Sequence, residues 1–247
     1  MINLTEKFKH IYVLTLSSRP DRYEHIKGQL ECMGIDINTI NVHYATPFPH
    51  NNIIADAFNK TGKGKFTKPN EFDCARNHYG IIREAYDRGF EDVLIIEDDI
   101  LFLNNPVEWN NALEKLPSDY DIIQFGGFTV SPNVKKYLTL KDVKYVEHPD
   151  VGLWNCSMYA LSRKGMQFYI AFMNVMFWVA DGPLYKAPMN TKLVKTYMTS
   201  IPMVIQADKA KITSDIRTAE NDNIDYNNDN MYEANIKLTD YFQSCNF

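Results

Sequence analysis

Short apolar runs that alternate with segments of helical periodicity restrict the fold of this chain more than any other feature. Residues 10–16 form a β-branched, apolar run that ends in Ser-Ser-Arg-Pro, a pattern typical of a buried strand entering a turn. Apolar residues then recur at helical spacing from Tyr23 to Met33, and Gly34 is placed to end that helix. This order predicts the first half of a βαβ unit, and therefore an α/β fold with a mixed, mainly parallel sheet flanked by helices.

The same patterns predict further elements along the chain. Strands are expected at residues 38–44, 93–96, 121–125, 145–146, 155–161 and 201–206, and helices at residues 71–86, 106–116 and 163–178. Ser162 is placed as the N-cap of the last of these helices. Residues 46–70 lack periodicity and are rich in Pro, Gly and Lys, which indicates a long loop. Residues 219–230 are rich in Asn and Asp, which predicts a polar loop before a short terminal segment.

Charge and cysteine usage exclude several classes of function. The chain has 26 Lys and Arg residues against 31 Asp and Glu residues, so it lacks the basic excess of a protein that binds nucleic acid. The four cysteines are scattered without a C-x-x-C pair, which argues against zinc fingers and redox motifs. We expect them to be reduced and mostly buried. No two of the six histidines have metal-ligand helical spacing, so each histidine is interpreted as structural.

The sequence predicts no transmembrane segment. Residues 1–9 are polar, without the apolar run of a secretory signal. Residues 166–180 are very apolar, but this stretch is shorter than the ~20 residues that a membrane-spanning helix needs. It is better interpreted as a core helix, and a cytoplasmic location is expected.

An acidic triplet, Glu97-Asp98-Asp99, directly follows the short apolar strand predicted at residues 93–96. Three adjacent carboxylates repel one another and need a cation or strong hydrogen-bond donors to remain ionised together. A hard divalent ion such as Mg²⁺ or Mn²⁺ fits this requirement, because these ions prefer oxygen ligands and bind substrate phosphates. The alternative is a solvated acidic turn at the end of a strand.

Two arginines follow the first predicted strand. The guanidinium groups of Arg19 and Arg22 could hold a ribose or a pyrophosphate through forked hydrogen bonds. The alternative is a charged helix start in which Ser17, Ser18 and Asp21 act as caps. The chain has neither a G-x-G-x-x-G nor a G-K-[ST] motif, so a dinucleotide fingerprint and a P-loop are both excluded.

Several segments, taken in order, resemble the family 25 glycosyltransferases, which include bacterial lipooligosaccharide galactosyltransferases and animal collagen galactosyltransferases. They are residues 11–22 (IYVLTLSSRPDR) with the following helix through Leu30, 71–78 (EFDCARNH), 94–99 (LIIEDD), 158–165 (MYALSRKG), 179–181 (VAD) and 201–206 (IPMVIQ). Each segment is weak alone, but their order and spacing are specific. Asn77 departs from the Ser that usually precedes the His of the second motif, and the Lys-rich loop has no counterpart that we can place.

The resemblance implies a GT-A type fold in one catalytic domain of residues 1–218, followed by a polar segment, residues 219–247. Its nucleotide-sugar half would be about residues 1–130 and its acceptor half about residues 131–218. The implied activity is inverting transfer of galactose or glucose from a UDP-sugar to a hydroxyl of a glycan or protein acceptor, with Mn²⁺ or Mg²⁺. The rival interpretation is a catalytically silent relative that binds a sugar nucleotide or acts as a scaffold.

The resemblance also assigns roles to individual residues. It implies that Glu97 and Asp99 bind the metal and that Asp98 contacts the diphosphate. The donor's base and ribose would lie near the first strand and its turn, at Thr15, Leu16, Ser17, Arg19 and Arg22.

Asp181 is our hypothesis for the base that removes the acceptor's proton, since a half-buried carboxyl in a Gly-Pro turn has a raised pKa. The alternative is an ordinary turn residue. Asn155 and Gln206 could complete the donor or acceptor pocket, and buried amides that satisfy strand backbones would look the same.

Overall fold

The structure is a computed structural model of the 247-residue chain, and it describes residues 2–46, 48–62, 66, 68–103, 105–127, 143–147, 153–175, 177–190 and 193–207. The strands are β1 Ile11–Leu16, β2 Asn41–Ala45, β3 Asp92–Glu97, β4 Ile100–Phe102, β5 Ile122–Gln124, β6 Tyr145–Glu147, β7 Met158–Ser162, β8 Thr196–Thr199 and β9 Val204–Gln206. The helices are α1 Leu4–Lys7, α2 Pro20–Cys32, α3 Asn51–Lys60, α4 Pro69–Asp87, α5 Pro106–Glu114, α7 Arg163–Val175 and α8 Gly182–Lys186. Two 3₁₀ turns cover Ile37–Thr39 and Ala187–Asn190.

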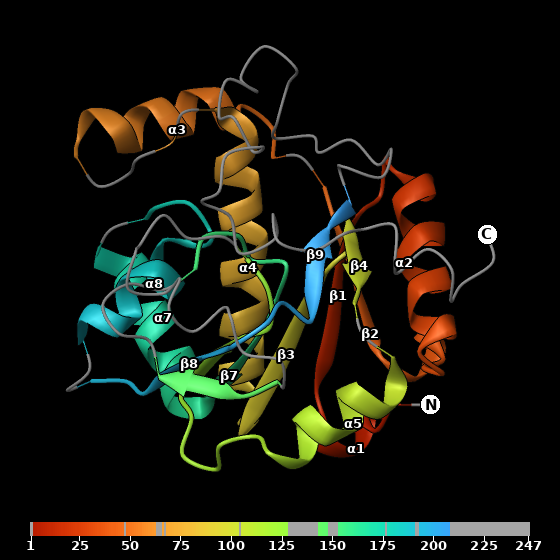
Figure 1. Cartoon of the computed structure of the whole chain (residues 1–247). Helices are drawn as coiled ribbons and strands as arrows, with labels where there is room; N and C mark the ends of the chain where they lie inside the picture. Colours follow the sequence, from red (N-terminus) through yellow and green to blue (C-terminus); the bar gives the residue numbers. More distant parts are fainter. Residues whose placement is uncertain are drawn as a thin grey trace, which may run out of the picture.

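The main sheet has the strand order β2-β1-β3-β7-β5-β8-β6. β4 pairs with β9 in a separate two-stranded sheet (Figure 1). β1, β2 and β3 are parallel, β7 is antiparallel to both β3 and β5, and β8 runs parallel to β5. β6 is antiparallel to β8. Five of the seven strands therefore run in one direction, which confirms the α/β class and the mixed, mainly parallel sheet.

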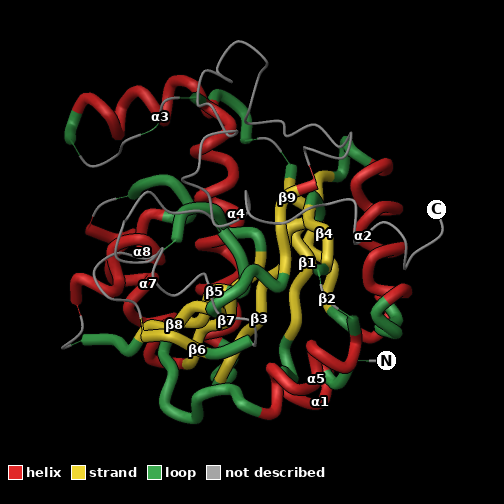
Figure 2. The backbone as a smooth tube through the Cα atoms, in the orientation of Figure 1, coloured by secondary structure: helices red, strands yellow, loops and turns green. Residues whose placement is uncertain are grey.

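Helices cover both faces of this sheet, as Figure 2 shows. In β3, Val93 and Ile95 belong to the apolar cluster that includes α4 and α7, whereas Leu94 and Ile96 belong to the cluster that includes α2 and α5. Successive side chains of a strand point to opposite faces, so a strand covered on both sides must be apolar throughout. The continuous apolar run before the acidic triplet is therefore a requirement of this fold.

The prediction of a long loop at residues 46–70 is wrong, because this stretch contains α3 and the start of α4. Phe58 of α3 lies 6.0 Å from the Phe72 ring and 5.3 Å from the Phe177 ring, measured between centroids. Helices of this length depend on tertiary packing more than on propensity, and the aromatic partners of α3 come from α4 and from a distant segment. That packing is invisible in the local pattern.

Other boundaries shift by a few residues. The last predicted helix ends at Val175, and its N-cap is confirmed, since Ser162 Oγ accepts a hydrogen bond from the Gly165 amide at 3.2 Å. The strand predicted at 201–206 shortens to β9, while β4, β8 and α8 were not predicted.

Three of the four cysteines fall within the described residues, and they are less buried than expected. Cys156 is buried and Cys74 is partly buried, but Cys32 is exposed at the end of α2. In the part of the chain that the structure describes, no helix combines the length and the apolar character that a membrane span requires. The cytoplasmic location stays a prediction, and the polar segment 219–247 lies outside the described residues.

Candidate functional site

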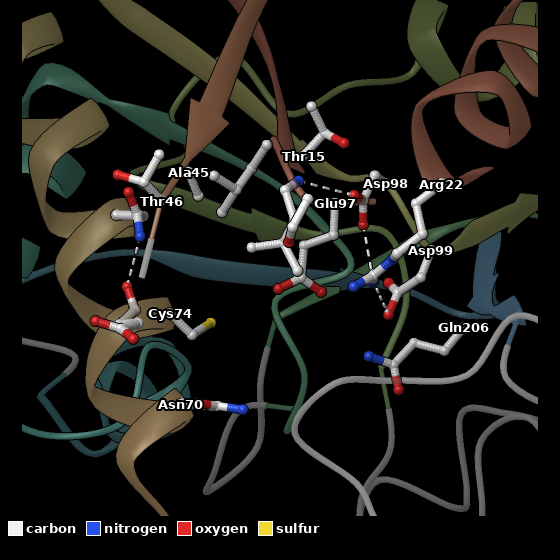
Figure 3. Close-up of a pocket in the computed structure, with 15 residues that line it drawn as sticks. Thr15, Arg22, Ala45, Thr46, Asn70, Cys74, Glu97, Asp98, Asp99 and Gln206 are labelled. Carbon is white, nitrogen blue, oxygen red and sulfur yellow. Dashed lines mark hydrogen bonds and ion pairs between the residues drawn. The ribbon is translucent and has the colours of Figure 1, made fainter. Parts of the chain in front are cut away.

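A cavity of about 330 Å³ opens where β1 and β3 end (Figure 3). It is lined by Leu14, Thr15, Leu16, Ser18, Arg22, Ala45, Thr46, Asn70, Asp73, Cys74, Asn77, Glu97, Asp98, Asp99 and Gln206. β1 and β3 are parallel neighbours in which Leu14 pairs with Glu97. Residues that follow the two strands therefore meet at one edge of the sheet, where open α/β sheets bind ligands.

Asp98 and Asp99 are buried at this edge, with exposed fractions of 3% and 4%, and both are ion-paired with Arg22. Figure 3 shows the Arg22 side chain reaching both carboxylates, with its Nη2 2.7 Å from Asp98 Oδ1. The Leu16 amide donates to Asp98 Oδ2 at 3.3 Å. Burial raises the pKa of Asp98 above its ordinary value, and the Arg22 charge opposes that shift. Arg22 and the Leu16 amide thus supply part of the hydrogen bonding that the crowded carboxylates of Asp98 and Asp99 require.

Glu97 takes a different set of partners from its two neighbours. Its Oε1 lies 3.2 Å from Nε2 of His78, whose side chain is fully buried, and His78 Nδ1 lies 2.8 Å from Tyr159 Oη. Cys74 lies one helical turn before His78 on α4, and burial raises the pKa of its thiol well above the usual value. This group was not predicted, because metal-ligand spacing was considered among the histidines alone and the histidine near Cys74 was overlooked. The four-residue spacing between Cys74 and His78 was the signal.

A second cavity of about 230 Å³ adjoins the first. It is lined by Glu71, Cys74, Glu97, Trp154, Asn155, Cys156, Val179, Ala180, Asp181 and Gln206, of which Cys74, Glu97 and Gln206 also line the first cavity. The Trp154 ring stacks on Tyr185 with 3.9 Å between centroids. The two cavities therefore meet along a shared wall, and one of them carries an aromatic side chain suited to contact a sugar ring.

Asp181 precedes α8, and its carboxyl lies in the second cavity. Burial is the main cause that raises its pKa to about 6, with a smaller contribution from the Glu97 charge. The Asn155 amide donates to Asp181 Oδ2 at 2.9 Å, from a backbone with a φ of 77° that Asn tolerates better than most residues. A carboxyl with this pKa ionises near neutral pH and remains a useful base.

The structure brings most of the predicted site residues together. Thr15, Leu16, Arg22, Glu97, Asp98, Asp99 and Gln206 line the first cavity, and Asn155 and Asp181 line the second. Asn155 Nδ2 lies 3.3 Å from Gln206 Oε1. Ser17 and Arg19 point elsewhere, since Ser17 Oγ donates to the Ala45 carbonyl at 3.4 Å and Arg19 pairs with Asp21 at 2.7 Å. Ser18, named from the sequence only as a helix cap, lines the first cavity.

Comparison with known proteins points to one family. The chain is 28% identical over 138 residues to "Inactive glycosyltransferase 25 family member 3" of Homo sapiens, covering 51% of this chain and 23% of that protein. It is 25% identical over 129 residues to "Procollagen galactosyltransferase 1-B" of Xenopus laevis, covering 48% of this chain and 21% of that protein. The chain thus spans less than a quarter of either relative.

The fold also has distant solved neighbours. The structure of galactosyltransferase LgtC in complex with donor and acceptor sugar analogs superposes with a TM-score of 0.37 and 9% identity, covering 76% of this chain and 72% of that one. At the level of sequence, the model of "Glycosyltransferase family 25 (LPS biosynthesis protein)" matches residues 8–179. Because that match covers more than half of this chain, the chain belongs to glycosyltransferase family 25.

Proposed function

We propose that this protein transfers a hexose, galactose or glucose, from a UDP-sugar to a hydroxyl of a glycan or protein acceptor, with inversion at the anomeric carbon. The observation that carries the proposal is the position of Asp181, a carboxyl with a pKa near 6, in a cavity that shares a wall with the acidic cavity. A transferase needs two neighbouring sites, one for the donor and one for the acceptor. It also needs a base on the acceptor side.

The first cavity suits the nucleotide and diphosphate of the donor. Glu97, Asp98 and Asp99 all line it, and a set of carboxylate oxygens fits a hard divalent cation. Glu97 and Asp99 would hold Mn²⁺ or Mg²⁺, whose charge would neutralise the leaving diphosphate. Arg22 places a further positive charge in the same cavity, where it can bind a phosphate oxygen. Thr15, Leu16 and Ser18 would lie against the ribose and base.

The second cavity suits the acceptor. The Asp181 carboxylate would accept the proton of the acceptor hydroxyl while that oxygen attacks the anomeric carbon from the side opposite the diphosphate. The Asn155 amide holds one carboxylate oxygen in place. The Trp154 ring lines the same cavity and can pack against a sugar.

A silent relative is the second candidate, and one specific observation favours it. Arg22 is ion-paired with both Asp98 and Asp99, so a cation of the protein already offsets part of the charge that a metal would otherwise offset. Two of the matched relatives, from Homo sapiens and Bos taurus, carry "inactive" in their names. A silent relative would keep the nucleotide pocket and lose transfer.

Calorimetric binding of UDP-, GDP- and CMP-linked sugars, with and without Mn²⁺, tests the donor site. We expect one donor, a UDP-sugar, to bind in a metal-dependent manner and Asp99→Ala to weaken that binding by at least tenfold. Arg22 keeps Asp98 as a partner in this variant, so the fold should survive. Asp87→Ala, which removes an exposed acid paired with Arg83, is the matched control and should bind normally. Failure of every donor to bind under any condition would reject the proposal in favour of a scaffold.

A further inference from the structure

We propose that Cys74, His78 and Glu97 form a zinc site in the wall between the two cavities, separate from the acidic pair Asp98 and Asp99. The Sγ, imidazole nitrogen and carboxylate oxygen of these residues all lie within 4.8 Å of one another. Cys74 and Glu97 line both cavities, so an ion can reach them from either side.

The spacing of the ligand atoms suits tetrahedral zinc. Zinc bonds of about 2.0–2.3 Å place neighbouring ligand atoms roughly 3.3–3.8 Å apart in a tetrahedron. The His78 Nε2 and Glu97 Oε1 atoms are already 3.2 Å apart. Cys74 and His78 are four residues apart on α4, so their side chains lie on the same helix face. All three ligand atoms lie within 4.8 Å of one another, so binding needs them to approach by at most about 1.5 Å.

The surroundings of His78 support a ligand role. A histidine that binds metal through Nε2 usually donates its other ring N–H to a second group, which fixes the tautomer. His78 Nδ1 lies 2.8 Å from the hydroxyl of Tyr159, and both side chains are fully buried. A hydroxyl can donate or accept, so Tyr159 can hold the tautomer that hydrogen-bonds to Glu97 and equally the tautomer that binds a metal.

The chemistry of the donor set selects the metal. A sulfur, a nitrogen and an oxygen ligand suit zinc, whereas Mg²⁺ and Mn²⁺ prefer oxygen alone. Three protein ligands leave a fourth position for water or a substrate oxygen in the cavity. Glu97 is also one of the two residues proposed to hold Mn²⁺, so zinc bound here would compete for it. The competition between zinc and Mn²⁺ for Glu97 rests on the proposed function, whereas the binding of zinc does not.

Titration of the metal-free protein with Zn²⁺ in a calorimeter tests the site. We expect one zinc ion per chain, with affinity reduced at least 100-fold in Cys74→Ala and in His78→Gln. Tyr159→Phe should reduce affinity by about 10–100-fold, as loss of a partner to a ligating histidine does. The control variants Cys32→Ala, which removes an exposed thiol, and Cys156→Ala, which removes a buried thiol of the second cavity, should bind zinc normally.

Substitution with Co²⁺ reports directly on the ligands. The wild-type spectrum should show a sulfur-to-cobalt charge-transfer band that is present in Cys32→Ala and absent in Cys74→Ala. If the buried His78 variant does not fold, Cys74→Ala and this spectrum still decide the question. The proposal is overturned if wild type binds no zinc, if Cys74→Ala binds it as tightly as wild type, or if cobalt shows no thiolate band. None of these measurements needs a donor, so their failure would leave the proposed transfer reaction untouched.

Discussion

Asp181→Asn is expected to abolish transfer and at the same time to stabilise the fold. The amide keeps the shape of the side chain and can still accept the Asn155 amide hydrogen, but it cannot take a proton from the acceptor. Loss of a general base costs about 10²–10⁴ in rate. The measurement is the initial rate of transfer at pH 7.5, with donor binding by calorimetry to show that the first cavity is intact.

The stabilisation follows from the raised pKa of Asp181. The pKa of Asp181 is about 6 in the folded protein against an ordinary value of 3.8, so the folded state binds the proton more tightly than the unfolded state. The free energy of unfolding therefore falls as pH rises from about 4 to 6, and above pH 6 the ionised carboxylate costs on the order of 2–3 kcal/mol. Asn avoids that cost, so its melting temperature should exceed that of wild type by several degrees at pH 7.5 and by little near pH 4.

Asp121→Asn is the matched control for this experiment. Asp121 is buried, but its carboxylate accepts a hydrogen bond from the Lys195 amide at 2.8 Å and pairs with Lys164 at 3.1 Å. We expect this variant to be no more stable than wild type and to retain transfer. An Asp181→Asn protein that transfers sugar at the wild-type rate would refute the assignment of Asp181 as the base. If Asp181→Asn and wild type were equally stable at pH 7.5, the claim that the ionised Asp181 carboxylate destabilises the fold would be refuted.

Arg22→Met is expected to destabilise the protein by about 3–5 kcal/mol, because it leaves the buried carboxylates of Asp98 and Asp99 without their shared cation. If these acids face a metal site, Mn²⁺ should restore part of the lost stability, since a bound ion supplies the missing charge. Chemical denaturation with and without Mn²⁺ measures both effects.

Arg19→Met serves as the control for the Arg22 experiment. Arg19 lies only three residues earlier in the chain and pairs with Asp21, which is exposed. An exposed pair contributes about 0–1 kcal/mol, so this variant should be nearly as stable as wild type and should not respond differently to Mn²⁺. An Arg22→Met protein of normal stability would contradict the buried ion pairs, and one that Mn²⁺ does not stabilise would count against the metal assignment.

The local sequence pattern predicted the acidic triplet at the end of β3, because this part of the site depends only on the order of residues along one strand. The apolar run of β3 and the acids that follow it are adjacent in sequence, and the sheet places the end of β1 beside them. The pairing of Arg22 with both acids was not predicted, because it depends on how α2 packs against β1 and β4. The sequence suggested two separate ligands, a metal for the acids and a phosphate for Arg22, where the structure joins the three side chains.

The position of Asp181 shows the same limit. The Gly-Pro turn predicted a restrained carboxyl, but its place beside the acidic cavity depends on the packing of α8 on α7 and of α7 on α4. The helix α3 was missed for a related reason, since its aromatic partners lie on α4 and at Phe177. In contrast, the spacing of Cys74 and His78 is local and was available from sequence.

The central claim is that Asp181 acts as a base in an active transferase, and the pH dependence of turnover tests it most directly. The initial rate of UDP release from a UDP-sugar, measured with acceptor and Mn²⁺ from pH 5 to pH 8, should rise about tenfold per pH unit below pH 6 and level off above it. Protonation of the base at low pH is the cause of the expected fall. A rate that is unchanged across this range, or no release of UDP at any pH, would contradict the account.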